Sequence, residues 1–188
     1  MVSSLSQAAA AVSPRLPARA RLRPTMQSDL EFVLTLEQNP EHAALIAPWE
    51  RTQHEAAIRF PDFRHFIIEG GSGLDAVGFV ILIGCRSQNH SLELKRMVVR
   101  DKGEGYGRAA IKVVKKVAFD DLGAHRLWLD VKARNARAIA FYDSEGFVEE
   151  GRLREAVRVG DEYETLVVKS MLKREFEARR MRAEEMRP

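Results

Sequence analysis

The chain has 188 residues and a formal net charge of only +3, from 30 Lys and Arg against 27 Asp and Glu. So small an excess gives no argument for nucleic-acid binding, and no apolar run approaches the roughly 18 residues that a membrane span needs. The length and the 45% apolar content favour one globular domain with tails, which we expect to be cytoplasmic. The single cysteine, Cys85, excludes an internal disulfide and is interpreted as a buried thiol. The histidines lack metal-ligand spacing, so we expect no metal site.

The N-terminal segment differs in composition from the rest of the chain. Residues 1–28 contain four arginines and no acid, with much Ala, Ser and Pro. A flexible tail, a targeting peptide and a start-site artefact all fit this composition. We therefore assign residues 1–20 to a tail, 21–172 to one domain and 173–188 to a charged helical tail.

The elements predicted in chain order describe a mixed α/β domain. A short strand at 21–23 and helices at 28–38, 41–47 and 52–60 come first, with prolines at the helix ends. Strands at 63–69, 76–85 and 92–99 follow, and their short connections are typical of an antiparallel meander. A helix to residue 122, a strand at 125–131, a helix at 135–145, a hairpin of strands at 147–159 and 162–171, and a last helix complete the chain. The middle crossover places one parallel strand pair in a mostly antiparallel sheet flanked by helices, an α/β (α+β) fold.

Three alternating glycines mark the most informative stretch of the sequence. Gly103, Gly105 and Gly107 stand between the strand at 92–99 and an amphipathic helix. Glycine allows a positive φ and a close approach of the backbone to a ligand, and the first turn of a helix offers unpaired N–H groups to an anion. Lys102 and Arg108 add positive charge on either side. The stretch therefore predicts a site for a phosphorylated cofactor, where the parallel strand pair and the loop meet.

Two other phosphate-binding motifs compete for this stretch. A nucleotide P-loop needs Lys and Ser or Thr after its last glycine, whereas Gly107 is followed by Arg108 and Ala109. The run from Gly105 to Ala110 fits a dinucleotide fingerprint, with Asp130 near the place of a ribose-binding acid. Too few strand–helix units follow it for such a domain, so a dinucleotide-binding oxidoreductase stays a minor alternative.

A third interpretation comes from resemblance. Lys102 to Gly107, KGEGYG, resembles the R/Q-x-x-G-x-G/A loop of the GNAT superfamily of acyl-CoA-dependent N-acetyltransferases, with Lys where Arg or Gln is usual. The pattern N-x-x-A-x-x-x-Y-x-x-x-G-F of that superfamily is matched by Asn135, Ala138, Tyr142, Gly146 and Phe147. The run that begins at Phe147 resembles the branch related to ribosomal-protein N-terminal acetyltransferases. The resemblance covers roughly residues 20–172 and implies the GNAT fold, whose parallel pair is splayed.

The resemblance also implies the co-substrate and its contacts. Acetyl-CoA is expected without a metal, its pyrophosphate on the loop and its pantetheine arm between the splayed strands, against the end of the first. Asn135 would cap the following helix and lie beside the pantetheine. The cofactor-binding residues expected on this basis are Met97, Val98, Val99, Lys102, Gly103, Glu104, Gly105, Tyr106, Gly107, Arg108 and Asn135.

Two side chains are candidates for proton transfer. An amine must attack as the free base, and Glu93, an acid in a largely apolar strand, is the candidate to accept its proton. The alternative is that Glu93 pairs with Lys95 on an exposed face. Tyr142 matches the family's general acid, because a phenol stays protonated at pH 7 and can donate to the departing sulfur. Packing beneath its helix is the alternative role.

The expected reaction is transfer of an acetyl group from acetyl-CoA to a primary amine by direct attack. The acceptor is a protein N-terminus or a small amine, bound by the N-terminal helices and the final hairpin, and Trp49, His54, Phe60 and Phe63 are either part of that site or core. A non-catalytic acyl-CoA-binding module is the alternative function. No membrane or nucleic-acid partner is expected, and a homodimer is left open.

Overall fold

The computed structural model describes residues 19–71 and 73–186, so most of the predicted N-terminal tail lies outside the described residues. The strands are β1 (Ala20–Pro24), β2 (Phe63–Gly70), β3 (Asp75–Ile83), β4 (Ser91–Val99), β5 (Arg126–Lys132), β6 (Val148–Val159) and β7 (Glu162–Leu172). The helices are α1 (Leu30–Gln38), α2 (Pro40–Ala43), α3 (Arg51–Arg59), α4 (Tyr106–Lys116), α5 (Ala136–Ser144) and α6 (Lys173–Glu185), with a 3₁₀ turn η1 (Gln27–Asp29) before α1 and a π-helical turn η2 (Val117–Asp121) after α4.

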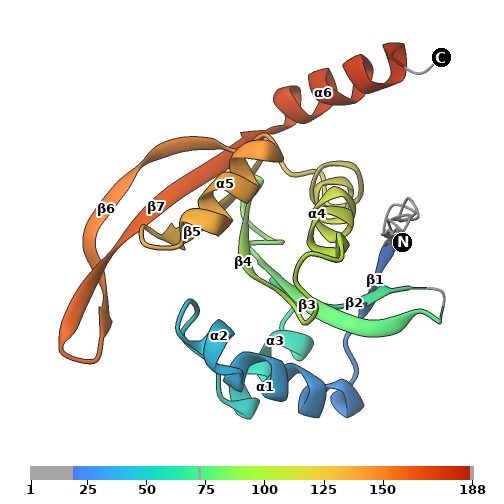
Figure 1. The fold of residues 1–188 in the computed structure, drawn as a ribbon. Helices are drawn as coiled ribbons and strands as arrows, with labels where there is room; N and C mark the ends of the chain where they lie inside the picture. The colour runs from blue at the N-terminus through green and yellow to red at the C-terminus, as the bar shows by residue number, and fades with distance from the viewer. Residues whose placement is uncertain (1–18, 72, 187–188) are drawn as a thin grey trace, which may run out of the picture.

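The seven described strands form one sheet in the order β1-β2-β3-β4-β5-β7-β6 (Figure 1). Every neighbouring pair is antiparallel except β4 and β5, which are parallel. The crossover between these two strands contains α4, as a parallel connection requires. The predicted fold class, a mixed and mostly antiparallel sheet flanked by helices, is confirmed.

The parallel pair separates soon after it begins. β4 and β5 pair at only three positions, the last of which joins Glu93 to Trp128. Beyond them the edge of β4 that faces β5 has no strand partner in the described pairing. A register shift against β3 leaves Lys95 unmatched between Leu94 and Arg96, which is a β-bulge and bends the strand. The splay opens a gap in the middle of the sheet at the point where β4 leads into the glycine loop.

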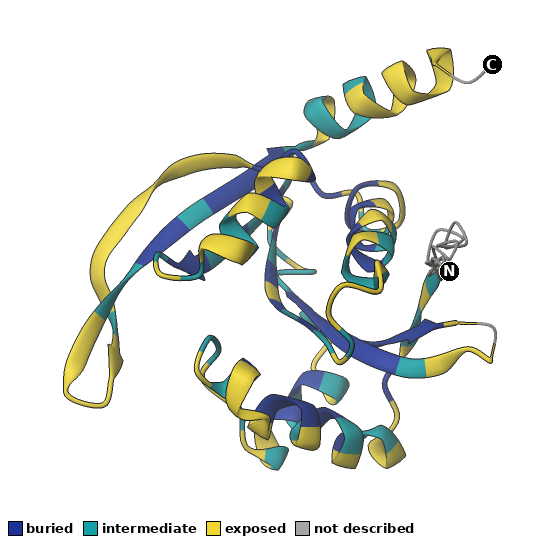
Figure 2. Ribbon diagram, in the orientation of Figure 1, coloured by how far each residue is buried: buried dark blue, intermediate teal, exposed yellow. Residues whose placement is uncertain are grey.

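Two apolar clusters cover the two faces of the sheet (Figure 2). One packs α4 against β4 and β5 and is centred on residues such as Ile111, Val114 and Leu127, all fully buried. The other packs α1 against β2 and β3 through residues such as Val33 and Phe79. Both faces are thus closed by helices, and the splay lies between the two clusters.

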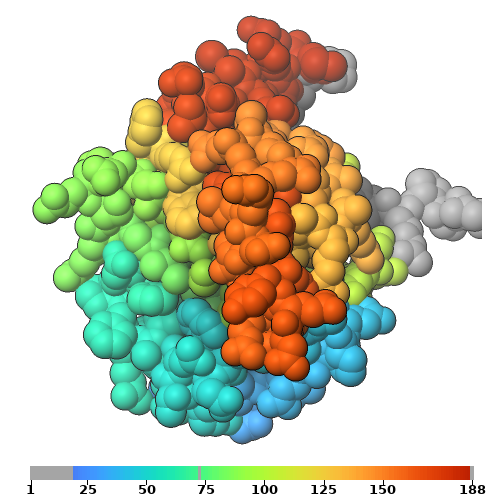
Figure 3. Space-filling view, turned by 90° about the vertical axis from the view of Figure 1, so that its left-hand side faces the viewer, coloured from blue at the N-terminus to red at the C-terminus, as the bar shows by residue number. Residues whose placement is uncertain are grey.

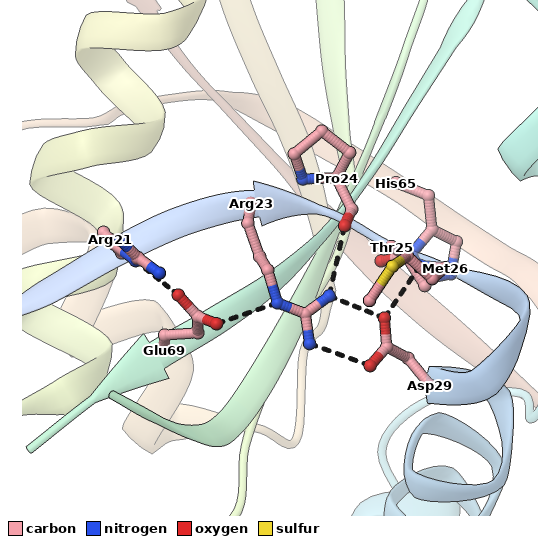
Figure 4. A network of polar contacts seen from close by, with 8 residues as sticks. All are labelled: Arg21, Arg23, Pro24, Thr25, Met26, Asp29, His65 and Glu69. Carbon is pink, nitrogen blue, oxygen red and sulfur yellow. Dashed lines mark hydrogen bonds and ion pairs between the residues drawn. The ribbon is translucent and has the colours of Figure 1, made fainter. Parts of the chain in front are cut away.

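A network of charged side chains holds the edge strand β1 in place (Figure 4). Arg23 binds Asp29 through both terminal nitrogens, at 2.6 and 2.8 Å, and its Nε donates to Glu69 on β2 at 2.8 Å. Arg21 forms a second ion pair with Glu69. The hydrogen bonds from Arg23 hold the pKa of Asp29 below its usual value. This bidentate geometry ties β1 to both β2 and the start of α1.

Two helical segments follow α4 and the last strand, β7. The helix predicted to run to residue 122 widens into the π turn η2, where the Leu122 N–H donates to the Val117 carbonyl at 2.9 Å. The segment predicted as a charged helical tail contains α6, which projects from the end of β7 (Figure 1). Its first turn is anchored because Phe176 stacks on Phe119 with the ring centroids 5.0 Å apart.

Candidate active site

The glycine loop adopts the conformation that its sequence predicts. Gly103 and Gly105 have φ values of 89° and 84°, in the left-handed region that favours glycine. Gly105 is the N-cap of α4, so the first N–H groups of that helix point out of the loop. The loop therefore offers backbone donors and a helix N-terminus to an anion.

A cavity of about 390 Å³ lies beside this loop and fits a small-molecule ligand. The lining includes Tyr142, the predicted general acid. Seven further lining residues are not among the predicted site residues: His42, Leu45, Ile46, Asp101, Arg137, Ala138 and Phe141. The predicted cofactor-binding residues in the lining are Met97, Val98, Val99, Lys102, Gly103, Gly105, Gly107, Arg108 and Asn135. The structure thus brings together the end of β4, the glycine loop and the start of α5.

Two predicted cofactor-binding residues do not line this cavity, Glu104 and Tyr106. The ring of Tyr106 packs instead over Gly70 on β2, where an added Cβ would stand 2.6 Å from the Tyr106 ring. Any contact of Tyr106 with a ligand would thus come from its backbone N–H at the start of α4.

The two cations that flank the loop each form an ion pair with a carboxylate. Lys102 forms an ion pair with Glu41 on α2, which lowers the pKa of Glu41. Arg108 lies 3.3 Å from a carboxylate oxygen of Glu145 and is well exposed. Both side chains line the cavity, so an anionic ligand would meet positive charge on either side of the loop.

Helix α5 is fixed firmly in front of the splay. Asn135 caps it by accepting a hydrogen bond from the Ala138 N–H at 3.1 Å. The buried amine of Lys115 donates to the backbone and to the side chain of Glu145, both at 3.0 Å, and Lys169 binds Asp143 at 2.7 Å. Two lysines from neighbouring elements therefore hold the C-terminal end of the helix that carries Tyr142.

Tyr142 lies where the cavity beside the loop meets a second cavity. Its side chain is 8% exposed, with Phe141 and Phe147 against its ring at centroid distances of 5.1 and 5.5 Å. Its hydroxyl has no hydrogen-bond partner among the described residues. Burial raises the pKa of Tyr142 above its usual value, so the phenol keeps its proton throughout the neutral range.

The second cavity, of about 360 Å³, lies on the other side of the splay. The loop after α2 contributes Ala47 and Trp49, and the final hairpin contributes Val157 and Leu166. Figure 3 shows this hairpin running down the face of the molecule as far as the N-terminal helices. The two cavities share Leu45, Ile46, Met97, Asn135, Ala138 and Tyr142.

A buried polar chain supports the wall of the second cavity. Glu37, fully buried on α1, lies 3.2 Å from Nε of Arg96 and accepts the Trp49 N–H at 2.6 Å. It also lies 3.5 Å from His54, whose ring contacts His65 at 3.0 Å. The guanidinium of Arg96 covers the Trp49 ring, 4.8 Å from its centroid. Burial, with His54 beside it, lowers the pKa of His65 to about 3.

The four aromatic and histidine candidates for the acceptor site lie in different environments. Trp49 alone lines a cavity, while His54 belongs to the buried polar chain and Phe63 packs against the second apolar cluster. Phe60 is 59% exposed. Trp49 lies outside any helix or strand, so periodicity alone could not separate it from the other three candidates.

Glu93, the predicted base, does not share a cavity with Tyr142. It lines neither cavity, and its carboxylate accepts a hydrogen bond from Lys95 at 2.9 Å. It belongs to the last pair of residues before β4 and β5 separate. Its role as base stays a prediction.

The sequence leads us to expect neither a metal ion nor a membrane-spanning helix. Among residues 19–71 and 73–186, no group of three or more His, Cys, Asp or Glu side chains is arranged to hold a metal ion. No helix in the same part of the chain is long and apolar enough to cross a membrane.

Comparison with known proteins decides between the alternatives for the loop. Residues 19–148 match the family described as "Acetyltransferase (GNAT) domain". The chain belongs to the GNAT family. Spermidine N(1)-acetyltransferase of Vibrio cholerae is 25% identical over 154 residues, which are 76% of this chain and 87% of that one. The putative ribosomal N-acetyltransferase YdaF of Bacillus subtilis is 29% identical over 101 residues, 53% of this chain and 55% of that one.

Solved structures agree with this assignment. The GNAT fold of this chain matches the crystal structure of spermidine N-acetyltransferase from Vibrio cholerae in complex with CoA and spermine, with a TM-score of 0.76. The sequences are 24% identical, and the match covers 84% of this chain and 98% of the other. This GNAT protein is therefore an N-acetyltransferase that uses acetyl-CoA as its co-substrate and an amine as its acceptor.

Proposed function

We propose that this GNAT enzyme transfers the acetyl group directly from acetyl-CoA to a primary amine of a small molecule or a protein N-terminus. The observation that carries this proposal is the position of Tyr142, a buried phenol that lines both the cavity beside the glycine loop and the second cavity. Such a position lets one side chain reach the bond between the two substrates. We assign acetyl-CoA to the first cavity and the acceptor to the second.

The cofactor contacts follow from the shape of the first cavity. The backbone N–H groups from Gly103 to Arg108 would bind the pyrophosphate, with Lys102 and Arg108 adding charge. The unpaired edge of β4 near Met97 would bind the pantetheine amides, as a further strand would. Asn135 would lie beside the same arm.

In the transfer step, the amine nitrogen forms a bond to the acetyl carbon and the bond from that carbon to sulfur breaks. Tyr142 donates a proton to the departing sulfur, and a base removes one from the amine, so that the proton count balances. Burial raises the pKa of Tyr142, which keeps it in the donating form. Two carboxylates compete for the role of base: Glu93, beside Lys95, and Asp130, which lines the second cavity.

A non-catalytic acyl-CoA-binding module remains the rival function, and one experiment separates it from the enzyme. The full chain is titrated with acetyl-CoA in a calorimeter, with NADH as control, and thiol release is then followed with a panel of primary amines. Micromolar binding of acetyl-CoA and amine-dependent thiol release are expected. Binding of acetyl-CoA without thiol release in the presence of any of the amines would favour the module. A heat of binding with NADH and none with acetyl-CoA would overturn the assignment of the first cavity.

A further inference from the structure

The second cavity has an unusual charge for a site that would bind a polyamine. Three of its lining residues are cationic, Lys95 and Arg96 from β4 and Lys132 from β5. Asp130 is the only carboxylate in that lining. A ligand with several ammonium groups would find one opposite charge and three like charges there, and like-charge contacts are costly.

Each of these three cations is paired with a carboxylate that lies outside the cavity lining. Arg96 pairs with Glu37, which is fully buried, Lys95 pairs with Glu93, and Lys132 lies 3.2 Å from Glu164. Glu37, Glu93 and Glu164 are absent from the cavity lining. They hold the cationic side chains in place, and a ligand in the cavity meets the cations first.

Asp130 differs from the three cationic residues of the lining, each of which forms an ion pair. Its carboxylate has no ion pair or side-chain hydrogen bond with another described residue. Alternation along β5 buries Leu129 and Val131 in the cluster with α4, so Asp130 and Lys132 share the opposite face of the strand. An unpaired carboxylate therefore lies beside the splay, next to fixed positive charge.

We propose that the second cavity selects a primary amine that also carries an anionic group, and that Asp130 receives the amine while the cations receive the anion. The inference rests on the proposed function and goes beyond it by naming the class of acceptor. It separates this chain from the Vibrio cholerae relative, which is named for spermidine.

The test compares acceptors that differ in one charge. 4-Aminobutanoate and 1,4-diaminobutane have the same spacing but end in a carboxylate and an ammonium, and the tripeptides Ala-Glu-Ala and Ala-Lys-Ala give the same contrast at a peptide N-terminus. Spermidine is included as the acceptor named for the relatives. In at least one of the two pairs we expect the anionic member to have the higher kcat/KM, by at least tenfold, and spermidine to be the poorer acceptor.

A substitution in the cavity lining tests whether the cationic residues cause the preference for the anionic acceptor. Lys95→Gln removes the most accessible cation of the lining, and Lys116→Gln removes an exposed charge from α4, outside either cavity. Lys95→Gln should reduce the preference for the anionic acceptor at least threefold, while Lys116→Gln should leave it unchanged.

Three outcomes would overturn the inference. Efficient acetylation of spermidine and the diamine, with a preference for them over the anionic acceptors, would overturn it and leave the proposed function in place. Thiol release from none of the acceptors, despite binding of acetyl-CoA, would overturn both. An equal preference in wild type and Lys95→Gln would remove the cavity charges as its cause.

Discussion

Replacing Tyr142 with Phe should separate catalysis from stability. The general-acid role predicts that kcat falls by about 10²-fold or more, the usual contribution of a positioned proton donor. The ring contacts with Phe141 and Phe147 would be kept. The lost hydroxyl has no hydrogen-bond partner among the described residues, and Tyr142 lines both cavities, so its removal breaks no hydrogen bond of the fold. The free energy of unfolding should therefore change by less than about 1 kcal/mol.

Steady-state thiol release measures the first effect and thermal unfolding measures the second. Tyr106→Phe is the matched control, because its ring packs over Gly70 outside the cavity and the same change should leave kcat intact. Because burial raises the pKa of Tyr142 above its usual value near 10, this group should not limit the rate between pH 7 and 9.5. A kcat equal to that of wild type at every pH would refute the acid. A destabilisation above about 1 kcal/mol would show that the hydroxyl has a partner.

Three further predictions use other parts of the site. Asp130→Asn should lower kcat/KM by about 10²-fold, as loss of a base does, while Glu93→Gln should change it little; the reverse result would establish Glu93 as the base. Gly105→Ala should weaken acetyl-CoA binding about tenfold in calorimetry, because a positive φ strains alanine by roughly 1–2 kcal/mol, whereas Gly123→Ala, at a φ of 65°, should reduce stability and leave affinity unchanged. Since the pKa of His65 is lowered to about 3, the folded state binds fewer protons than the unfolded chain between that value and about 6.5. Stability should fall below pH 6.5 by up to about 1.4 kcal/mol per pH unit, and urea titrations that show an equal slope in His65→Gln would contradict this.

The conformation of the glycine loop and the start of α5 could be predicted because their signals are local. The positive φ of Gly103 and Gly105 and the cap at Asn135 depend on residues a few positions apart. The apolar spacing of α4 likewise follows from one turn to the next. Each of these patterns is contained in a short stretch of sequence, and the structure has the loop conformation, the helix cap and the helix that they predict.

The acceptor half depends on contacts that no short stretch contains. The sequence favours Glu93 as the base because an acid is unusual in an apolar strand. The bulge at Lys95 shifts the alternation of β4 just after Glu93. Arg96, which follows the bulge, lines the second cavity, whereas Glu93, which precedes it, does not. Whether a side chain faces that cavity is decided by the register against β3 and by the point where β4 and β5 part, both of which are non-local.

The family match says less about the acceptor than about the donor, because part of the second cavity lies outside it. The family match ends at residue 148, whereas Val157 and Leu166 of the hairpin beyond it help to line the second cavity. The opposite wall comes from the irregular loop that contains Trp49. A shared cofactor loop therefore fixes the donor, and the acceptor must be inferred from the charges that this chain places around Asp130.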